Sequence, residues 1–184
     1  STKEDPVYRW VLREYVGFLL QKRFHLEWYI EGTRSRTGKL MPPKLGLLRY
    51  VVDASLEDRS DDVALLPVSL MYDELSEVSD YSAEARGAIK APEGLSWALK
   101  FYRAQRGHFG KIYVRFGEPI FLKDELAAVR ERVARGEEAG DISLELNKIA
   151  FELSWRINFV TPATGSALVC LILLAVRDRA LTLD

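Results

Sequence analysis

The sequence has 184 residues, of which 48% are hydrophobic and 29% are charged, so the chain can bury a core and remain soluble. The formal net charge of −1 gives no global electrostatic attraction to nucleic acid, and we expect no nucleic-acid partner. The single cysteine, Cys170, excludes a disulfide framework, and its place in an apolar run predicts a core position.

The first half of the chain predicts helices and strands in alternation. Asp5 followed by Pro6 is typical of a helix N-terminus, because aspartate caps free N–H groups and proline fits the first helical position. Apolar spacing and turn residues then predict a helix to about residue 23, a strand over 26–30, a loop over 31–43, a second helix from residue 45 and a buried strand over 63–70.

The second half of the chain predicts mostly helices. The predicted elements are a helix over 92–104, a strand over 111–116, helices over 123–134 and 144–157, and a last helix that Thr164 caps and that reaches about residue 179. The apolar run over 167–176 is too short to cross a bilayer, which takes ~20 residues. We therefore expect a buried helix there.

The order of these elements predicts the fold class. Alternation of helices and strands favours an α/β fold with a mostly parallel or mixed central sheet flanked by helices. The sequence contains no internal repeat, no low-complexity tract and no linker that would divide it. We therefore expect residues 1–184 to belong to a single domain.

A basic loop follows the predicted strand over 26–30. From Arg34 to Lys44 the chain carries four cations and no acidic residue, whereas the next stretch is acidic. The cations are Arg34, Arg36, Lys39 and Lys44, and the acidic residues are Asp53, Glu57, Asp58, Asp61 and Asp62. Because the two charges are separated along the chain, the basic loop is a local arrangement and not a consequence of average composition.

The basic loop is suited to an anion, most simply a phosphate. Loops after the carboxyl ends of parallel strands are where α/β sheets bind ligands, and the planar fork of arginine can hold two phosphate oxygens. Gly32 and Gly38 let backbone N–H groups approach an anion closely. Composition alone leaves a solvated basic loop as an open alternative. A nucleotide P-loop is excluded, because the two glycines are six positions apart and Leu40 follows Lys39.

Four segments of the chain resemble one enzyme family. They are residues 31–39 (EGTRSRTGK), 66–73 (LPVSLMYD), 114–119 (VRFGEP) and 158–162 (NFVTP). The first resembles the third conserved block of the glycerolipid acyltransferases, in the form found in the glycerol-3-phosphate acyltransferase branch, and the second resembles the fourth block. The resemblance covers nearly the whole chain.

The resemblance implies transfer of a fatty acyl group from acyl-CoA or acyl carrier protein to the sn-1 hydroxyl of glycerol 3-phosphate, in phospholipid biosynthesis. The family uses a histidine as general base and an aspartate, five positions later, to orient it. Here His25 is followed at that distance by Ile30, and His108 by Tyr113, so neither histidine fits. We therefore expect the pair upstream of Ser1, with this chain as the C-terminal part of an acyltransferase domain truncated at its N-terminal side.

The resemblance also implies which residues bind the substrate. They are Glu31, Gly32, Thr33, Arg34, Ser35, Arg36, Lys39, Pro67 and Ser69. The cations would hold the phosphate, the other loop residues would shape the loop, and Pro67 and Ser69 would line a neighbouring strand end. No cofactor and no metal are implied, and two isolated histidines with one cysteine give no zinc-ligand spacing.

Two alternatives to glycerol 3-phosphate acylation remain open. The acceptor could instead be dihydroxyacetone phosphate, or the chain could be a non-catalytic module that binds phosphate without the histidine. For the enzyme, a lipid product implies that the full-length protein works on the cytoplasmic side of a membrane, peripherally or anchored through parts absent here.

Overall fold

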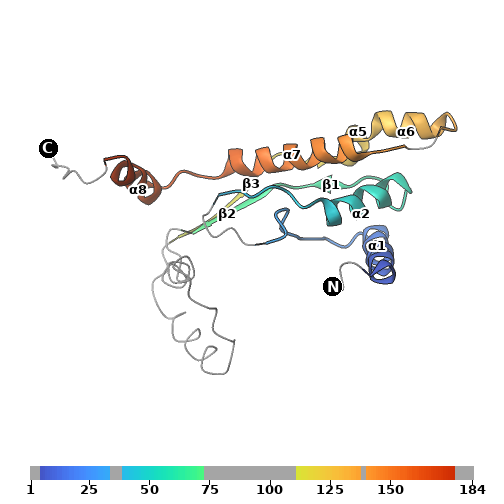
Figure 1. Cartoon of the computed structure of the whole chain (residues 1–184), viewed down its shortest axis with the longest axis horizontal. Helices are drawn as coiled ribbons and strands as arrows, with labels where there is room; N and C mark the ends of the chain where they lie inside the picture. The colour runs from blue at the N-terminus through green and yellow to red at the C-terminus, as the bar shows by residue number, and fades with distance from the viewer. Residues whose placement is uncertain (1–4, 34–38, 73–110, 138–139, 177–184) are drawn as a thin grey trace, which may run out of the picture. The chain divides into compact units, whose positions relative to one another are not determined.

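The computed structural model describes residues 5–33, 39–72, 111–137 and 140–176 (Figure 1). Contacts divide the chain into two compact units, one made of residues 1–68 and 116–160 and the other of residues 69–115 and 161–184. The helix predicted over 92–104 lies outside the described residues. Membership of all 184 residues in one domain stays a prediction.

The first unit is mainly helical. Its helices are α1 (Pro6–Gln21), α2 (Leu45–Leu56), α5 (Leu122–Glu125), α6 (Ala127–Ala134) and α7 (Ser143–Val160). The predicted start of α1 is confirmed, since the Asp5 carboxylate accepts the N–H of Val7 at 2.9 Å. One helix was predicted over 123–134, but the chain forms α5 and α6, because the backbone leaves helical geometry at the fully buried Leu126.

Helix α2 lies at the centre of the core of this unit. It packs against α1, α5 and α7, and its residues Leu48 and Val52 are both fully buried. Burial of apolar surface contributes about 25 cal/mol per Å², so such residues fix the helix firmly. The basic loop gains two anchors from this core: Ile30, only 7% exposed, precedes the loop, and α2 begins directly after Lys44.

Two short sheets are present in the described residues. Strands β1 (Ala64–Leu65) and β4 (Ile120–Phe121) pair antiparallel, with Ala64 opposite Phe121. Strands β2 (Val68–Tyr72) and β3 (Ile112–Phe116) form the other sheet, and β3 confirms the strand predicted over 111–116. The strand predicted over 63–70 is divided into β1 and β2 at Pro67, which has no N–H to donate to a ladder.

The α/β class is confirmed, but a central sheet flanked by helices is not. The predicted strand over 26–30 is wrong, because residues 24–29 take part in no strand pairing. The side chains of this segment nevertheless alternate as in a strand: Leu26, Trp28 and Ile30 turn to the core, and the residues between them are exposed. The alternation follows from an extended chain lying on a core, which does not require a neighbouring strand.

Helix α8 (Gly165–Val176) belongs to the second unit. The predicted cap is confirmed, since the hydroxyl of Thr164 accepts the N–H of Ala167 at 3.2 Å. The expectation that the apolar run and Cys170 are buried is wrong: α8 contains no buried residue, and Cys170 is exposed. Among the described residues, no single helix is long and apolar enough to cross a membrane, and only α7 and α8 taken as a pair meet that criterion.

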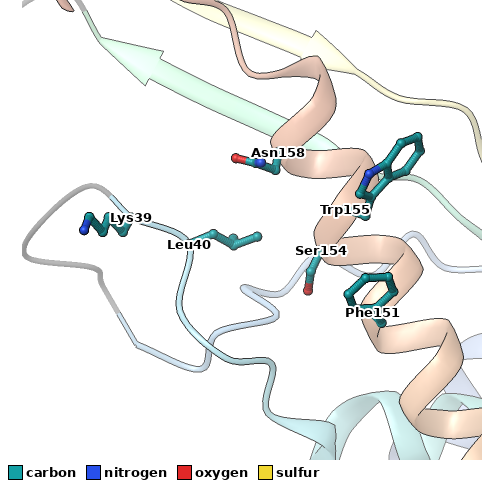
Figure 2. Close-up of a pocket in the computed structure, with 6 residues that line it drawn as sticks. All are labelled: Lys39, Leu40, Phe151, Ser154, Trp155 and Asn158. Carbon is teal, nitrogen blue, oxygen red and sulfur yellow. The ribbon is translucent and has the colours of Figure 1, made fainter. Parts of the chain in front are cut away.

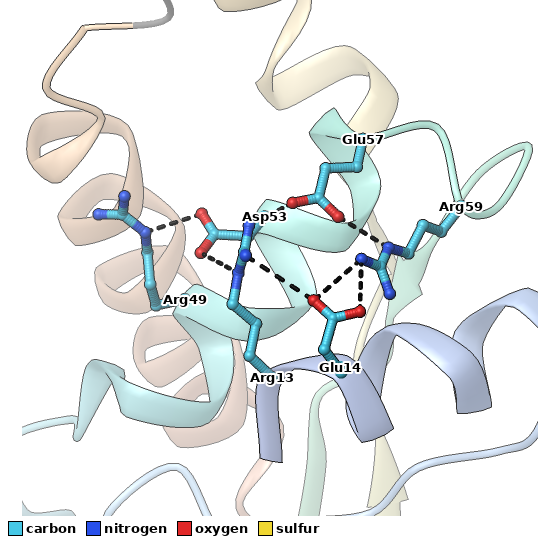
Figure 3. Close-up of polar contacts among 6 residues, drawn as sticks. All are labelled: Arg13, Glu14, Arg49, Asp53, Glu57 and Arg59. Carbon is cyan, nitrogen blue, oxygen red and sulfur yellow. Dashed lines mark hydrogen bonds and ion pairs between the residues drawn. The ribbon is translucent and has the colours of Figure 1, made fainter. Parts of the chain in front are cut away.

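Ion pairs join α1 to α2 and to the turn after it (Figure 3). Arg59 donates to both carboxylate oxygens of Glu14, at 2.9 Å and 3.2 Å, and to Glu57 at 2.7 Å. Arg13 bonds Glu57 and lies 3.5 Å from a carboxylate oxygen of Asp53. The bonds to Glu14 and then Glu57 raise the pKa of Arg59 above its ordinary value, so this guanidinium stays charged at every relevant pH.

Gly17 is buried in α1 at the point where Arg59 crosses the helix. A Cβ atom at position 17 would lie 2.5 Å from Nη1 and 2.9 Å from Cδ of Arg59. Glycine inside a helix costs about 1 kcal/mol relative to alanine. Glycine is nevertheless required at this position, because the Arg59 guanidinium bonded to Glu14 and Glu57 occupies the space that a Cβ atom would fill.

We predict that Gly17→Ala lowers the free energy of unfolding, because the methyl group displaces Arg59 from its two carboxylates. When Arg59 is first replaced by alanine, the same Gly17→Ala change should instead stabilise by about 0.5–1 kcal/mol, through helix propensity alone. Denaturant unfolding of the two single variants and the double variant measures both effects. A stabilising Gly17→Ala with Arg59 present would contradict the prediction.

Candidate functional site

The base of the basic loop is closed by two hydrogen bonds. The N–H of Lys44 donates to the carbonyl oxygen of Ile30 at 2.7 Å, and the N–H of Met41 donates to the carboxylate of Glu31 at 2.8 Å. Both bonds join residues from the start of the loop to residues at its end. The loop therefore leaves the core and returns to it at nearly the same place, with Arg34, Arg36 and Lys39 between the two ends in sequence.

Gly32 makes the first turn of the loop. Its N–H donates to the carbonyl oxygen of Tyr29 at 2.9 Å, and its φ of +64° lies in the left-handed region. A Cβ atom at this position would lie 2.9 Å from Cγ of Lys44. Both the conformation and the space thus require glycine, which accounts for this residue between Glu31 and Thr33.

The structure describes only part of the predicted phosphate loop. Thr33 and Lys39 are exposed on either side of residues 34–38. Arg34, Ser35 and Arg36 lie outside the described residues. Their placement in the binding site therefore stays a prediction from the sequence.

The acidic stretch that follows the loop is paired with arginines that do not belong to the loop. Four carboxylates have such partners: Asp53 with Arg49 at 2.8 Å, Glu57 with Arg59 at 2.7 Å, Asp58 with Arg130 at 2.5 Å, and Asp61 with Arg23 at 2.7 Å. These four carboxylates are neutralised by cations outside the loop. Each of these carboxylates therefore has an arginine partner that does not belong to the loop.

An open groove lies between the end of the basic loop and one face of α7. Its volume is about 560 Å³, and it is lined by Lys39, Leu40, Phe151, Ser154, Trp155 and Asn158. Figure 2 shows Leu40 pointing from the loop towards α7, with Lys39 farther out along the loop. We call this feature the α7 groove. Its lining includes a cation of the loop and exposed aromatic side chains of α7.

Helix α7 is held in place at both ends. Asp141 caps its first turn: the carboxylate accepts the N–H of Ser143 at 2.9 Å and also the Ser143 hydroxyl. These bonds lower the pKa of Asp141, so the cap is present at neutral pH and is lost as the pH falls through that pKa. Near the other end, Arg156 donates to the carbonyl oxygens of Glu118 and Pro119, both at 2.9 Å.

The segment 114–119 (VRFGEP) therefore helps to position α7. The N–H of Gly117 donates to the carbonyl oxygen of the fully buried Pro67 at 2.8 Å. A Cβ atom on Gly117 would lie 3.2 Å from Pro67 and 3.6 Å from Val160 of α7. Pro67 thus packs beside α7, and its place in the substrate site stays a prediction.

Ser69 belongs to the second unit and is 5% exposed. Its hydroxyl is hydrogen-bonded to that of Thr161 at 2.7 Å, which joins the segments 66–73 and 158–162 noted in the sequence. In the part of the chain that the structure describes, no group of histidine, cysteine, aspartate and glutamate side chains is placed to hold a metal ion.

Sequence reasoning gave no role to the aromatic residues of α7. Phe151, Trp155 and Phe159 are spaced four residues apart, and their exposed fractions are 70%, 50% and 74%. The buried face of the same helix is formed by other residues, among them Leu146, Ile149 and Leu153. Aromatic residues at helical spacing on the face away from the core are the signal that could have revealed the groove.

Comparison with known proteins identifies the family. A family model described as the glycerol-3-phosphate acyltransferase C-terminal region matches residues 81–184. The chain belongs to the glycerol-3-phosphate acyltransferase family. A second model, described as acyltransferase, matches residues 3–71, which include the basic loop.

Curated relatives of the family match along the whole chain. "Putative acyltransferase plsB1" of Mycobacterium tuberculosis and of Mycobacterium bovis is 43% identical over 184 residues, which is 100% of this chain and 28% of the relative. "Glycerol-3-phosphate acyltransferase" of Aeromonas hydrophila is 35% identical over 186 aligned positions, 99% of this chain and 23% of the relative. The chain thus spans about a quarter of the length of these relatives.

We predict that Gly32→Ala destabilises the loop, since it adds about 1 kcal/mol of backbone strain and a contact with Lys44. Gly46 is the matched control, because a Cβ atom there meets nothing within 4 Å. As Gly46 lies in α2, Gly46→Ala should be neutral or stabilising. Thermal unfolding of the two variants compares them, and equal melting temperatures would contradict the prediction.

Proposed function

We propose that the protein to which this chain belongs transfers a fatty acyl group from acyl-CoA or acyl carrier protein to the sn-1 hydroxyl of glycerol 3-phosphate. The observation that carries the proposal is the basic loop, closed at its base by Glu31 and by the Ile30–Lys44 bond, in a chain of this family. Such a loop presents several cations from a fixed base. A small dianion such as glycerol 3-phosphate suits it.

In this proposal Arg34, Arg36 and Lys39 hold the phosphate, while Glu31, Gly32, Thr33 and Ser35 shape the loop. Arginine can bind two phosphate oxygens at once, and its bonds to phosphate are charge-assisted. Phosphate binding fixes the acceptor, so its sn-1 hydroxyl is presented in one orientation to the acyl donor. Pro67 supports the site by packing beside α7.

The chemistry is a direct acyl transfer. The hydroxyl oxygen attacks the thioester carbonyl, the carbon–sulfur bond breaks, and the hydroxyl proton passes through a general base to the leaving thiol. Neither His25 nor His108 has an aspartate at the family's spacing, so we propose that the histidine–aspartate pair is supplied by residues outside this chain. Since the product is a lipid, we also propose that the full-length protein works at the cytoplasmic surface of a membrane.

The test is an assay of the full-length protein with glycerol 3-phosphate and a long-chain acyl-CoA or acyl carrier protein. The expected product is 1-acylglycerol 3-phosphate, and residues 1–184 alone should give none, because general-base catalysis contributes about 10²–10⁴-fold. Preference for dihydroxyacetone phosphate would reassign the acceptor. Phosphate-ligand binding without any turnover by the full-length protein would mean a non-catalytic module.

We predict that Arg34→Ala in the full-length protein raises the KM for glycerol 3-phosphate about tenfold to a hundredfold. A charge-assisted bond to phosphate is worth about 1.5–3 kcal/mol, and about 1.4 kcal/mol is a factor of ten. Arg34→Lys should recover part of the loss, because it keeps the charge without the planar fork. Initial rates at varied glycerol 3-phosphate give these constants.

The KM for the acyl donor serves as the internal control for Arg34. It should change little in both variants, because the thioester makes no use of this cation. If instead the KM for acyl-CoA rises and the KM for glycerol 3-phosphate stays constant, the loop binds the phosphates of the donor and the proposal is wrong.

A further inference from the structure

We infer that the α7 groove holds the fatty acyl chain of the donor, with Trp155 and Phe151 of α7 on one side and Leu40 of the loop on the other. The inference rests on the proposed function and adds to it a place for one substrate. The evidence lies in the chemistry of the groove, in its position next to the phosphate loop and in the exposure of its aromatic side chains.

The wall that α7 contributes is one continuous face of the helix. Phe151, Ser154, Trp155 and Asn158 are spaced by three, one and three residues, so their side chains lie above one another along the helix. The Ser154 hydroxyl donates to the carbonyl oxygen of Ala150 at 2.8 Å, which uses its proton within the helix. The wall therefore offers mainly apolar surface, with Asn158 as a polar residue at one end.

The aromatic side chains of this wall are ordered although they are exposed. The rings of Trp155 and Phe159 are stacked, with centroids 5.1 Å apart and planes inclined by 17°. Aromatic pairs attract one another beyond the burial of their area, so stacking holds the indole in place before a ligand binds. A preformed aromatic wall suits a long apolar ligand, because little entropy is lost in ordering the wall when the ligand binds.

The position of the groove agrees with the geometry that acyl transfer requires. In glycerol 3-phosphate the reacting hydroxyl lies only three carbons from the phosphate, so the thioester carbonyl has to come close to the phosphate loop. The acyl chain must then leave along a neighbouring surface. Leu40 directly follows Lys39, so the groove begins next to the last predicted phosphate ligand of the loop.

The size and charge of the groove favour the acyl chain over the nucleotide end of the donor. A volume of about 560 Å³ falls within the range of about 300–1,000 Å³ found for small-molecule sites. Lys39 is the one charged residue among its lining, whereas the phosphates of coenzyme A call for several cations. A fatty acyl chain with its thioester end towards Lys39 agrees with both the volume of the groove and its single charged lining residue.

The experiment varies the length of the acyl chain in the full-length protein. Trp155→Ala and Phe151→Ala should each raise the KM for a long-chain acyl-CoA by about tenfold, the effect expected for losing ~1.4 kcal/mol of apolar contact. The KM for butyryl-CoA and the KM for glycerol 3-phosphate should change less than twofold. Leu144→Ala is the matched control, because Leu144 is 64% exposed on α7 and does not line the groove.

Direct binding separates this inference from the proposed function. A non-hydrolysable thioether analogue of palmitoyl-CoA is titrated against wild type and Trp155→Ala, and the affinity should fall about tenfold in the variant. If wild type gives no turnover but shows this difference, the proposed function fails and the groove assignment stands. If turnover is normal and the variants affect long and short chains equally, the groove assignment fails and the proposed function stands.

A variant of the opposite wall covers the case in which a change on α7 prevents folding. Leu40→Ser leaves α7 intact and should produce the same chain-length dependence. Unchanged binding of the palmitoyl analogue in a folded Leu40→Ser protein would overturn the inference.

Discussion

The bond from the Lys44 N–H to the Ile30 carbonyl oxygen is the constraint on which the candidate site depends. The entropic cost of closing a flexible loop grows only slowly with its length. Fixing the two ends of the loop therefore lowers this cost more than shortening the loop would. The core supplies those ends, since Ile30 is buried and α2 starts at Leu45. Glu31 adds a second closure one residue farther out, through its bond to the N–H of Met41.

The second wall of the site depends on a different set of contacts. Arg156 ties α7 to the carbonyl oxygens of Glu118 and Pro119, and Gly117 packs against Pro67 and Val160. The loop and the helix are thus positioned separately, each by backbone carbonyls and buried apolar groups. The α7 groove lies between these two separately anchored parts.

Local signals carried most of the correct predictions. Caps and apolar spacing located α1, α2, α7 and the start of α8, because these signals depend only on residues close together in sequence. The division of β1 from β2 was missed although Pro67 is a local signal against a continuous strand. The division of α5 from α6 was missed because Leu126 is apolar and continues the helical spacing, while its non-helical backbone appears only in the structure. The exposure of Cys170 on α8 was missed for a related reason, since an apolar run reveals its hydrophobicity and not what covers it.

For the site, the sequence revealed the charge and the structure added the shape. The run from Glu31 to Lys39 was recognisable because it resembles a conserved block of the family, whereas its composition alone left a solvated basic loop open. The role of Glu31 as a closure depends on Met41, ten positions on, and no local pattern indicates that pair. The aromatic residues of α7 could be assigned to an exposed face only once the structure showed which other residues form the buried face.

The closure of the loop has a further consequence, for hydrogen exchange. The amide protons of Met41 and Lys44 are bonded to groups at the opposite end of the loop, outside the hydrogen bonds of any helix or ladder. They can therefore exchange with solvent deuterium by opening of the loop alone, while α2 stays folded. A phosphate ligand that binds the closed loop slows this exchange in proportion to its occupancy. The exchange rates of these two amides thus measure the occupancy of the phosphate site without turnover, since no acyl donor is needed.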